Sequence, residues 1–165
     1  AARDCKLVHC MAGIPPASTP PVTAAALFAA NIAWAAEQAK AAGVRLALEP
    51  INHRDMPGYH LNTMQQGADV VAAIGAERVG LQFDLYHCQI TEGDITKRIE
   101  KLLPVIVHMQ LADVPDRHEP GTGEIGWDYV LPRIDALGYQ GWIGCEYRPA
   151  GDTVAGLAWR ERFKV

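Results

Sequence analysis

The sequence alternates between short apolar segments typical of buried strands and longer segments typical of helices, and this alternation restricts the folds open to it. Strands that alternate with helices pair in parallel, and both faces of a parallel sheet are covered. The pattern therefore predicts an α/β fold. Its five strand candidates are "KLVHCM", "RLALEP", "VGLQFD", "VIVHMQ" and "GWIGCEY".

The segments between the strand candidates carry the signals of helix ends. The longest predicted helix runs from about Val22 to Ala42 and stops at Gly43. Residues 85–93, "LYHCQITEG", are predicted to be a loop, and so is the long segment 111–126. Because no linker divides the sequence, residues 1–165 are predicted to form a single domain. Further helices are expected from Asn62 or Thr63 to Ile74, from Asp94 to Leu102, from about Asp128 to Leu137, and from Asp152 to Arg162.

Two architectures fit parallel strands with helical crossovers: an open doubly wound sheet and a (β/α) barrel. The open sheet usually carries a G-x-G-x-x-G phosphate loop after its first strand, and this sequence has none. "GTGEIG" follows a strand but lacks that spacing. The barrel places its chemistry on inward side chains at the carboxyl ends of the strands.

Four consecutive strand candidates end with a polar side chain on one face. Side chains two apart on a strand share a face, so His108 and Gln110 lie together while the opposite face of "VIVHMQ" is apolar. We expect the four terminal groups to point into one cavity, although each of them can instead pair separately with an arginine or with the backbone. The four residues are Glu49, Asp84, Gln110 and Glu146.

Three carboxylates and an amide oxygen in one half-buried space repel unless a cation neutralises them. Oxygen ligands suit Mg²⁺ or Mn²⁺, while Zn²⁺ or Co²⁺ stays open because His108 is near. No organic cofactor is expected. Two carboxylates across a divalent cation suit the movement of a proton between adjacent carbons, as in isomerases and epimerases. Serine-type hydrolysis is not indicated, because the only serine, Ser18, lies in a Pro-rich loop.

Composition excludes other classes of partner. The net charge is −4 and the basic residues are scattered, so no nucleic-acid surface is expected. The Ala-rich segment near residue 30 predicts a packed helix and no membrane span. The four cysteines form no C-x-x-C pair, which indicates reduced thiols and a cytoplasmic protein.

Six short motifs occur in an order that resembles one known family. They are "LEPIN", "DMPGY", "DLYHCQ", "HMQLAD", "RHEPGTGEI" and "GCEYRP". From about Val8 to Pro149 the chain resembles the hydroxypyruvate isomerase family of the xylose-isomerase-like barrels, close to the 2-oxo-tetronate isomerases. The resemblance implies an isomerase that interconverts hydroxypyruvate and 2-hydroxy-3-oxopropanoate (tartronate semialdehyde), or the analogous 2-oxo-tetronate, through an enediolate.

The resemblance also implies roles for individual residues. Glu49 and Glu146 match the acid–base pair, and together with Asp84 and Gln110 they match the metal positions. Gln110 stands where related sugar epimerases carry a histidine, which disfavours softer metals. The substrate-binding residues are expected to be His87, which donates to a substrate oxygen, Arg117, which clamps the carboxylate, and His108, which supports them. The alternative for Arg117 is a surface salt bridge with Asp116 or Glu119.

A full barrel of this type takes about 250 residues, so five strands predict a truncated barrel that lacks its N-terminal β/α units. Such a partial barrel has exposed strand edges, and we expect it to associate as a homo-oligomer. The small substrate is expected to be a 2-oxo or hydroxy acid. The rival hypotheses are a ketose 3-epimerase, a nuclease of the same superfamily, which needs more histidine ligands and a basic groove, and an inactive half-barrel that acts only by association.

Overall fold

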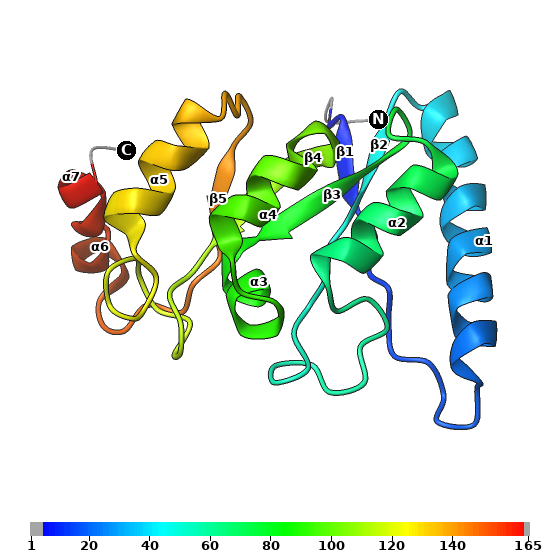
Figure 1. Ribbon diagram of the computed structural model, residues 1–165, viewed down its shortest axis with the longest axis horizontal. Coiled ribbons are helices and arrows are strands. Elements are labelled where there is room, and N and C mark those ends of the chain that lie inside the picture. Colours follow the sequence, from blue (N-terminus) through cyan, green and yellow to red (C-terminus); the bar gives the residue numbers. More distant parts are fainter. Residues whose placement is uncertain (1–4, 164–165) are drawn as a thin grey trace.

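Five parallel strands form one sheet in the order of the sequence (Figure 1). The computed structural model describes residues 5–163. Each strand pairs in parallel with the next one along the chain, which is the arrangement of a barrel wall and confirms the predicted fold class. The strands are β1 (Leu7–His9), β2 (Arg45–Leu48), β3 (Val79–Asp84), β4 (Ile106–Leu111) and β5 (Ile143–Cys145).

Helices connect the strands and lie along one face of the sheet, where α4 passes in front of the strands and α5 lies beside β5 in Figure 1. Two hydrophobic clusters fill the space between these layers. The helices are α1 (Pro21–Ala41), α2 (Met64–Ile74), α3 (Leu85–Thr91), α4 (Ile95–Leu102), α5 (Trp127–Ala136), α6 (Thr153–Gly156) and α7 (Trp159–Phe163), with a 3₁₀ turn over Leu103–Val105.

The ends of α2 follow from its sequence. The Thr63 hydroxyl accepts a hydrogen bond from the backbone of Gln66, and the Gln66 side chain accepts one from the backbone of Thr63. This reciprocal capping box satisfies donors that the first helical turn leaves unpaired. The helix stops at Gly75, whose φ of 115° is open to glycine and rarely to other residues. The sequence prediction for this helix is confirmed at both ends.

Two predictions about helices are wrong. Residues 85–91 form α3 instead of a loop, because the Asp84 carboxylate accepts hydrogen bonds from the backbone N–H groups of Tyr86 and His87 and so caps a short helix. The tail forms two short helices, α6 and α7, instead of one. Asp94 precedes α4 as expected, but its side chain makes no capping hydrogen bond there.

The inner face of the sheet is closely fitted at Gly80 in β3. A Cβ atom at this position would lie 2.2 Å from Cγ1 of Val107, so any larger residue would have to displace the Val107 side chain on the neighbouring strand. The pairing between β3 and β4 also shifts by one residue at this level, between Leu81 and Gln82. After the shift, Gln82 lies beside His108 and Asp84 beside Gln110, so the polar ends of the two strands are in register.

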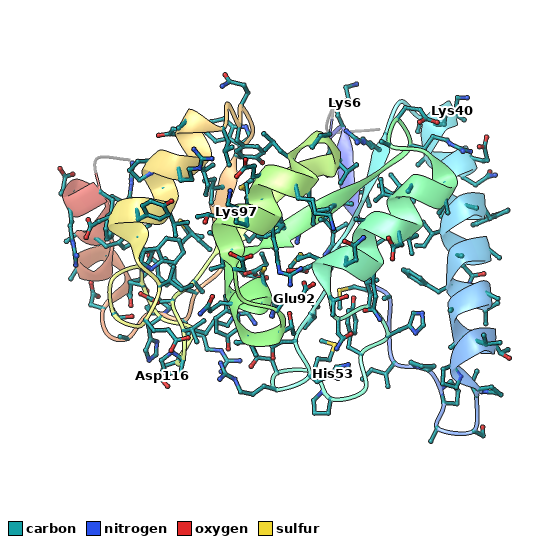
Figure 2. All side chains as sticks on the ribbon, in the orientation of Figure 1. Lys6, Lys40, His53, Glu92, Lys97 and Asp116 are labelled. Carbon is teal, nitrogen blue, oxygen red and sulfur yellow. The ribbon has the colours of Figure 1, made fainter. Side chains whose placement is uncertain are left out.

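All five strands run in the same direction, so their carboxyl ends meet at one end of the sheet. Figure 2 shows His53 and Asp116, from the loops after β2 and β4, at this end, with Lys6 and Lys40 at the opposite end. Within residues 5–163, no helix is long and apolar enough to cross a membrane.

Candidate active site

Four ionisable side chains meet at the carboxyl end of the sheet. One ligand atom from each of Glu49, Asp84, His87 and Glu146 lies within 4.8 Å of the others. Glu49 follows β2, Asp84 ends β3, His87 lies on α3 directly after β3, and Glu146 follows β5, so the ends of three strands supply the four groups. The first three are buried and Glu146 is exposed. The predicted convergence of Glu49, Asp84 and Glu146 is therefore present in the structure.

Asp84 is held by one of its two carboxylate oxygens. Oδ1 accepts hydrogen bonds from the backbone N–H groups of Tyr86, at 2.8 Å, and His87, at 3.3 Å. Oδ2 is buried and has no hydrogen-bond partner, although Nε2 of His87 lies 3.9 Å away. Burial raises the pKa of the Asp84 carboxyl to about 7, and the charge of Glu146 adds to this. One oxygen thus anchors the side chain while the other stays available to a ligand.

Glu49 shows the same division between its two oxygens. Oε2 lies 3.4 Å from Nε2 of His9, whereas Oε1 is buried without a hydrogen-bond partner, 3.9 Å from Nε2 of His87. Burial raises the pKa of the Glu49 carboxyl to about 8, and the nearby charges of Asp84 and Glu146 raise it further. Carboxylates crowded in this way favour a proton or a cation among them.

His87 is buried and stays uncharged at neutral pH. Burial lowers the pKa of its imidazole to about 3, and the positive charge of Arg117 acts in the same direction. Nδ1 of the ring lies 2.7 Å from Nδ2 of Asn52, and Nε2 faces the carboxylates. A neutral imidazole in this place presents a hydrogen-bonding group to the site without adding charge.

Arg117 reaches into the site from the loop after β4. Its Nη2 lies 2.6 Å from Oε2 of Glu146, its Nη1 lies 3.2 Å from Oδ2 of Asp55, and its Nε donates to the backbone carbonyl of Glu146. The guanidinium also packs over the Tyr86 ring, 5.0 Å from its centroid. The alternative of a surface salt bridge with Asp116 or Glu119 is wrong, because the ion pairs of Arg117 are with Glu146 and Asp55.

Gln110 and His108 lie on the same inner face of β4. Gln110 is beside Asp84 in the register of the sheet, and its Oε1 accepts a hydrogen bond from Nε2 of Gln82. His108 is beside Gln82, one pleat further from the strand ends, and falls outside the group of four. The structure thus places Gln110 next to the carboxylates and His108 behind it.

The sequence analysis predicted no role for several residues that surround the site. His9 lies at the end of β1 and contacts Glu49. Its position at a strand end is the feature of the sequence that could have predicted its place in the site. Tyr86 donates its hydroxyl to Asp55 and packs under Arg117. Asn52 bonds His87 from a different loop. Contacts made by loop residues leave no periodic pattern in a sequence. Of these residues, only His9 could therefore have been predicted.

The donor set fits a divalent cation. Among the described residues, three carboxylates converge, two of their buried oxygens lack hydrogen-bond partners, and the pKa of two of them is raised by burial and like charge. A cation removes that repulsion and pairs both oxygens. Oxygen-rich ligation is typical of Mg²⁺ and Mn²⁺.

Comparison with known proteins agrees with this geometry. A family model described as xylose isomerase-like TIM barrel matches residues 1–163. The chain belongs to this family. A solved structure from Brucella melitensis, titled AP endonuclease, family 2, superposes with a TM-score of 0.92 at 39% identity and covers 98% of this chain and 62% of that one. The resemblance drawn from the motifs is confirmed.

Curated relatives within the family are named as isomerases. The 2-oxo-tetronate isomerase of Cupriavidus necator is 47% identical over 156 residues, which cover 94% of this chain and 60% of that protein. The hydroxypyruvate isomerase of Escherichia coli is 38% identical over 159 residues, covering 96% and 62%. The chain therefore spans about three fifths of the length of these relatives.

Solved sugar epimerases share the fold at lower identity. D-psicose 3-epimerase of Clostridium cellulolyticum H10, solved with D-tagatose, superposes with a TM-score of 0.74 at 23% identity and covers 92% of this chain and 54% of that one. At this identity the likeness shows the fold alone.

Proposed function

We propose that the protein is an isomerase that moves a proton between two adjacent carbons of a small 2-oxo acid. The observation that carries the proposal is the meeting of the Glu49 and Glu146 carboxylates in one group with Asp84 and His87. Two carboxylates that reach the same small molecule can serve as base and acid in turn. The relatives named hydroxypyruvate isomerase and 2-oxo-tetronate isomerase support this class of reaction.

The reaction needs a proton to leave one carbon and another to arrive at its neighbour. In hydroxypyruvate, one glutamate takes a proton from the hydroxyl-bearing carbon, and the electron pair forms an enediolate with the adjacent carbonyl. The other glutamate supplies a proton to that second carbon, while the proton of the hydroxyl passes to the new alkoxide oxygen. The product is 2-hydroxy-3-oxopropanoate, so atoms and charge balance without an oxidant.

Glu49, Asp84 and Glu146 would hold the divalent cation, with Gln110 as the neighbouring neutral oxygen ligand. A bound Mg²⁺ or Mn²⁺ supplies Lewis-acid stabilisation of negative charge that develops on substrate oxygens. His87 faces the same space through Nε2 and donates a hydrogen bond to a substrate oxygen. His108 supports this first layer of residues from behind.

Arg117 is proposed to recognise the substrate carboxylate. Its guanidinium has five N–H groups, and the contacts with Glu146 and Asp55 use three of them, one on each nitrogen. One N–H on each terminal nitrogen remains, which is the pair that a carboxylate engages side by side. An acidic substrate is thus favoured over a neutral sugar.

A direct test compares turnover of hydroxypyruvate and 2-oxo-tetronate with turnover of a neutral ketose, in the wild type and in Arg117→Ala. We expect the acids to be converted and the variant to raise KM for them about 10-fold or more, since a charged hydrogen bond contributes about 1.5–3 kcal/mol. Arg133→Ala, which removes a surface pair with Glu100, is the matched control. Preferred turnover of the neutral ketose would instead support the epimerase hypothesis.

We also propose that copies of the chain associate through their sheet edges. Within residues 5–163, β1 and β5 are the two ends of the sheet, and each pairs with one neighbouring strand. Unpaired strand edges favour association. Light scattering after size-exclusion chromatography should give a mass of at least twice 17.9 kDa, and a monomer would contradict this.

We also propose a cytoplasmic location for the protein, since all four cysteines are free thiols.

A further inference from the structure

The Asn52 side chain connects the loop after β2 with helix α3. It lies in the loop after β2 and is completely buried. Its Oδ1 accepts a hydrogen bond of 2.8 Å from the backbone N–H of Asp55, within the same loop. Its Nδ2 lies 2.7 Å from Nδ1 of His87, on α3.

The orientation of this amide follows from its partner in the loop. A backbone N–H can only donate, so the Asn52 atom that faces Asp55 is the carbonyl oxygen. The atom that faces His87 is therefore the NH₂ group, which can only donate. The backbone N–H of Asn52 also points to the same ring nitrogen, at 3.5 Å. Nδ1 of His87 thus accepts, and it carries no proton.

A neutral imidazole carries a single N–H, so the proton of His87 must be on Nε2. Nε2 lies 3.9 Å from Oε1 of Glu49 and 3.9 Å from Oδ2 of Asp84, the two buried oxygens that have no hydrogen-bond partner. The N–H of His87 therefore points into the space between the carboxylates, where the substrate would lie.

We propose that Asn52 is a positioning residue that fixes His87 as the tautomer with its proton on Nε2, so that His87 donates to a substrate oxygen and offers no lone pair to a cation. The part of this inference that concerns the reaction rests on the proposed function. The tautomer itself does not, because it follows from the hydrogen bonds of Asn52. It also restricts the cation ligands in this group to carboxylate oxygens, although His87 is near enough to be counted among them.

Nitrogen NMR measures the tautomer directly. In protein labelled with ¹⁵N-histidine, two-bond proton–nitrogen correlations show which ring nitrogen carries the proton. We expect the wild type at neutral pH to show His87 protonated on Nε2 alone. A His87 ring protonated on Nδ1, with or without Nε2, would overturn the inference, and this result requires no variant to fold.

Asn52→Asp tests the cause. The carboxylate keeps an oxygen for the backbone N–H of Asp55 but presents an acceptor to His87, so Nδ1 is expected to gain a proton and turnover to fall about 10- to 100-fold. Asn52→Leu adds no charge and is expected to populate both tautomers. Asn62→Asp is the matched control, because Nδ2 of Asn62 lies 3.4 Å from Nδ1 of His53 in the same loop, away from the four groups of the site, and its turnover should equal that of the wild type.

The outcomes separate the two claims. A folded Asn52→Asp protein in which His87 keeps its proton on Nε2 alone overturns the role of Asn52 in setting the tautomer. A tautomer that changes while turnover does not overturns its role in the reaction. If the wild type shows the Nε2 proton but converts none of the acids, the proposed function fails while the tautomer assignment stands.

Discussion

Glu49→Gln should stabilise the metal-free protein, although it removes a residue of the proposed machinery. Glu49 is 4% exposed, and its pKa rises from 4.5 to about 8 on folding because of burial and neighbouring carboxylates. The folded state therefore binds the proton more tightly than the unfolded state, and stability is lost as pH rises from 4.5 to 8. At about 1.4 kcal/mol per pH unit, the loss is about 3 kcal/mol at pH 7. Glutamine has no proton to lose, so the variant avoids this penalty.

Thermal unfolding in the presence of a chelator, at pH 5 and at pH 7, measures the effect. We expect Glu49→Gln to melt about 6–12 °C above the wild type at pH 7 and within about 3 °C of it at pH 5. Glu119→Gln is the control, because Glu119 is also buried but its Oε2 already accepts a hydrogen bond from the backbone N–H of Ala150, which a glutamine oxygen can accept equally, so this substitution should not raise the melting temperature. A Glu49→Gln protein that is less stable than the wild type at pH 7, or a difference that is equal at both pH values, would refute the electrostatic reasoning.

Three further predictions concern the cation, the loop after β4 and the sheet. Mn²⁺ at 100 times its dissociation constant should stabilise the wild type by about 2.7 kcal/mol in thermal melts and leave Asp84→Asn almost unaffected; equal shifts would place the cation elsewhere. Asp113→Asn should lower the free energy of unfolding, measured in urea, by about 3 kcal/mol. The buried Asp113 carboxylate accepts hydrogen bonds from four backbone N–H groups and from the indole N–H of Trp127. An unchanged urea midpoint would show that these bonds contribute no net stability. Gly80→Ala should cost about 1–3 kcal/mol through its clash with Val107, and a neutral effect would mean that the strands can separate there.

The strands and the convergence of the carboxylates could be predicted because side chains alternate between the two faces of a strand. In a parallel sheet, inward side chains at successive strand ends approach one another, so the sequence alone predicts that Glu49, Asp84 and Glu146 lie close together. The short strands β1 and β5 were predicted to be longer than they are. Helix α3 was missed because one side chain, Asp84, supplies its cap at the same time as it ends β3.

The contacts that the loops make with one another and with α3 could not be predicted from the sequence. Asn52 and His87 are 35 residues apart, and Arg117 and Asp55 are 62 apart. Nothing in either local pattern indicates the partner, since such pairs depend on how the loops fold over the strand ends. The salt-bridge alternative for Arg117 failed for this reason, because it considered only acidic residues near in sequence.

The central claim is that Glu49 and Glu146 move a proton between adjacent carbons of one small acid. Proton NMR of hydroxypyruvate in D₂O, with Mg²⁺ or Mn²⁺ present, tests it most directly. The account predicts that product forms with deuterium from the solvent on carbon, and that Glu146→Gln abolishes both product and exchange while its circular dichroism matches the wild type. Product that contains no solvent deuterium, or wild-type turnover by Glu146→Gln, would contradict it.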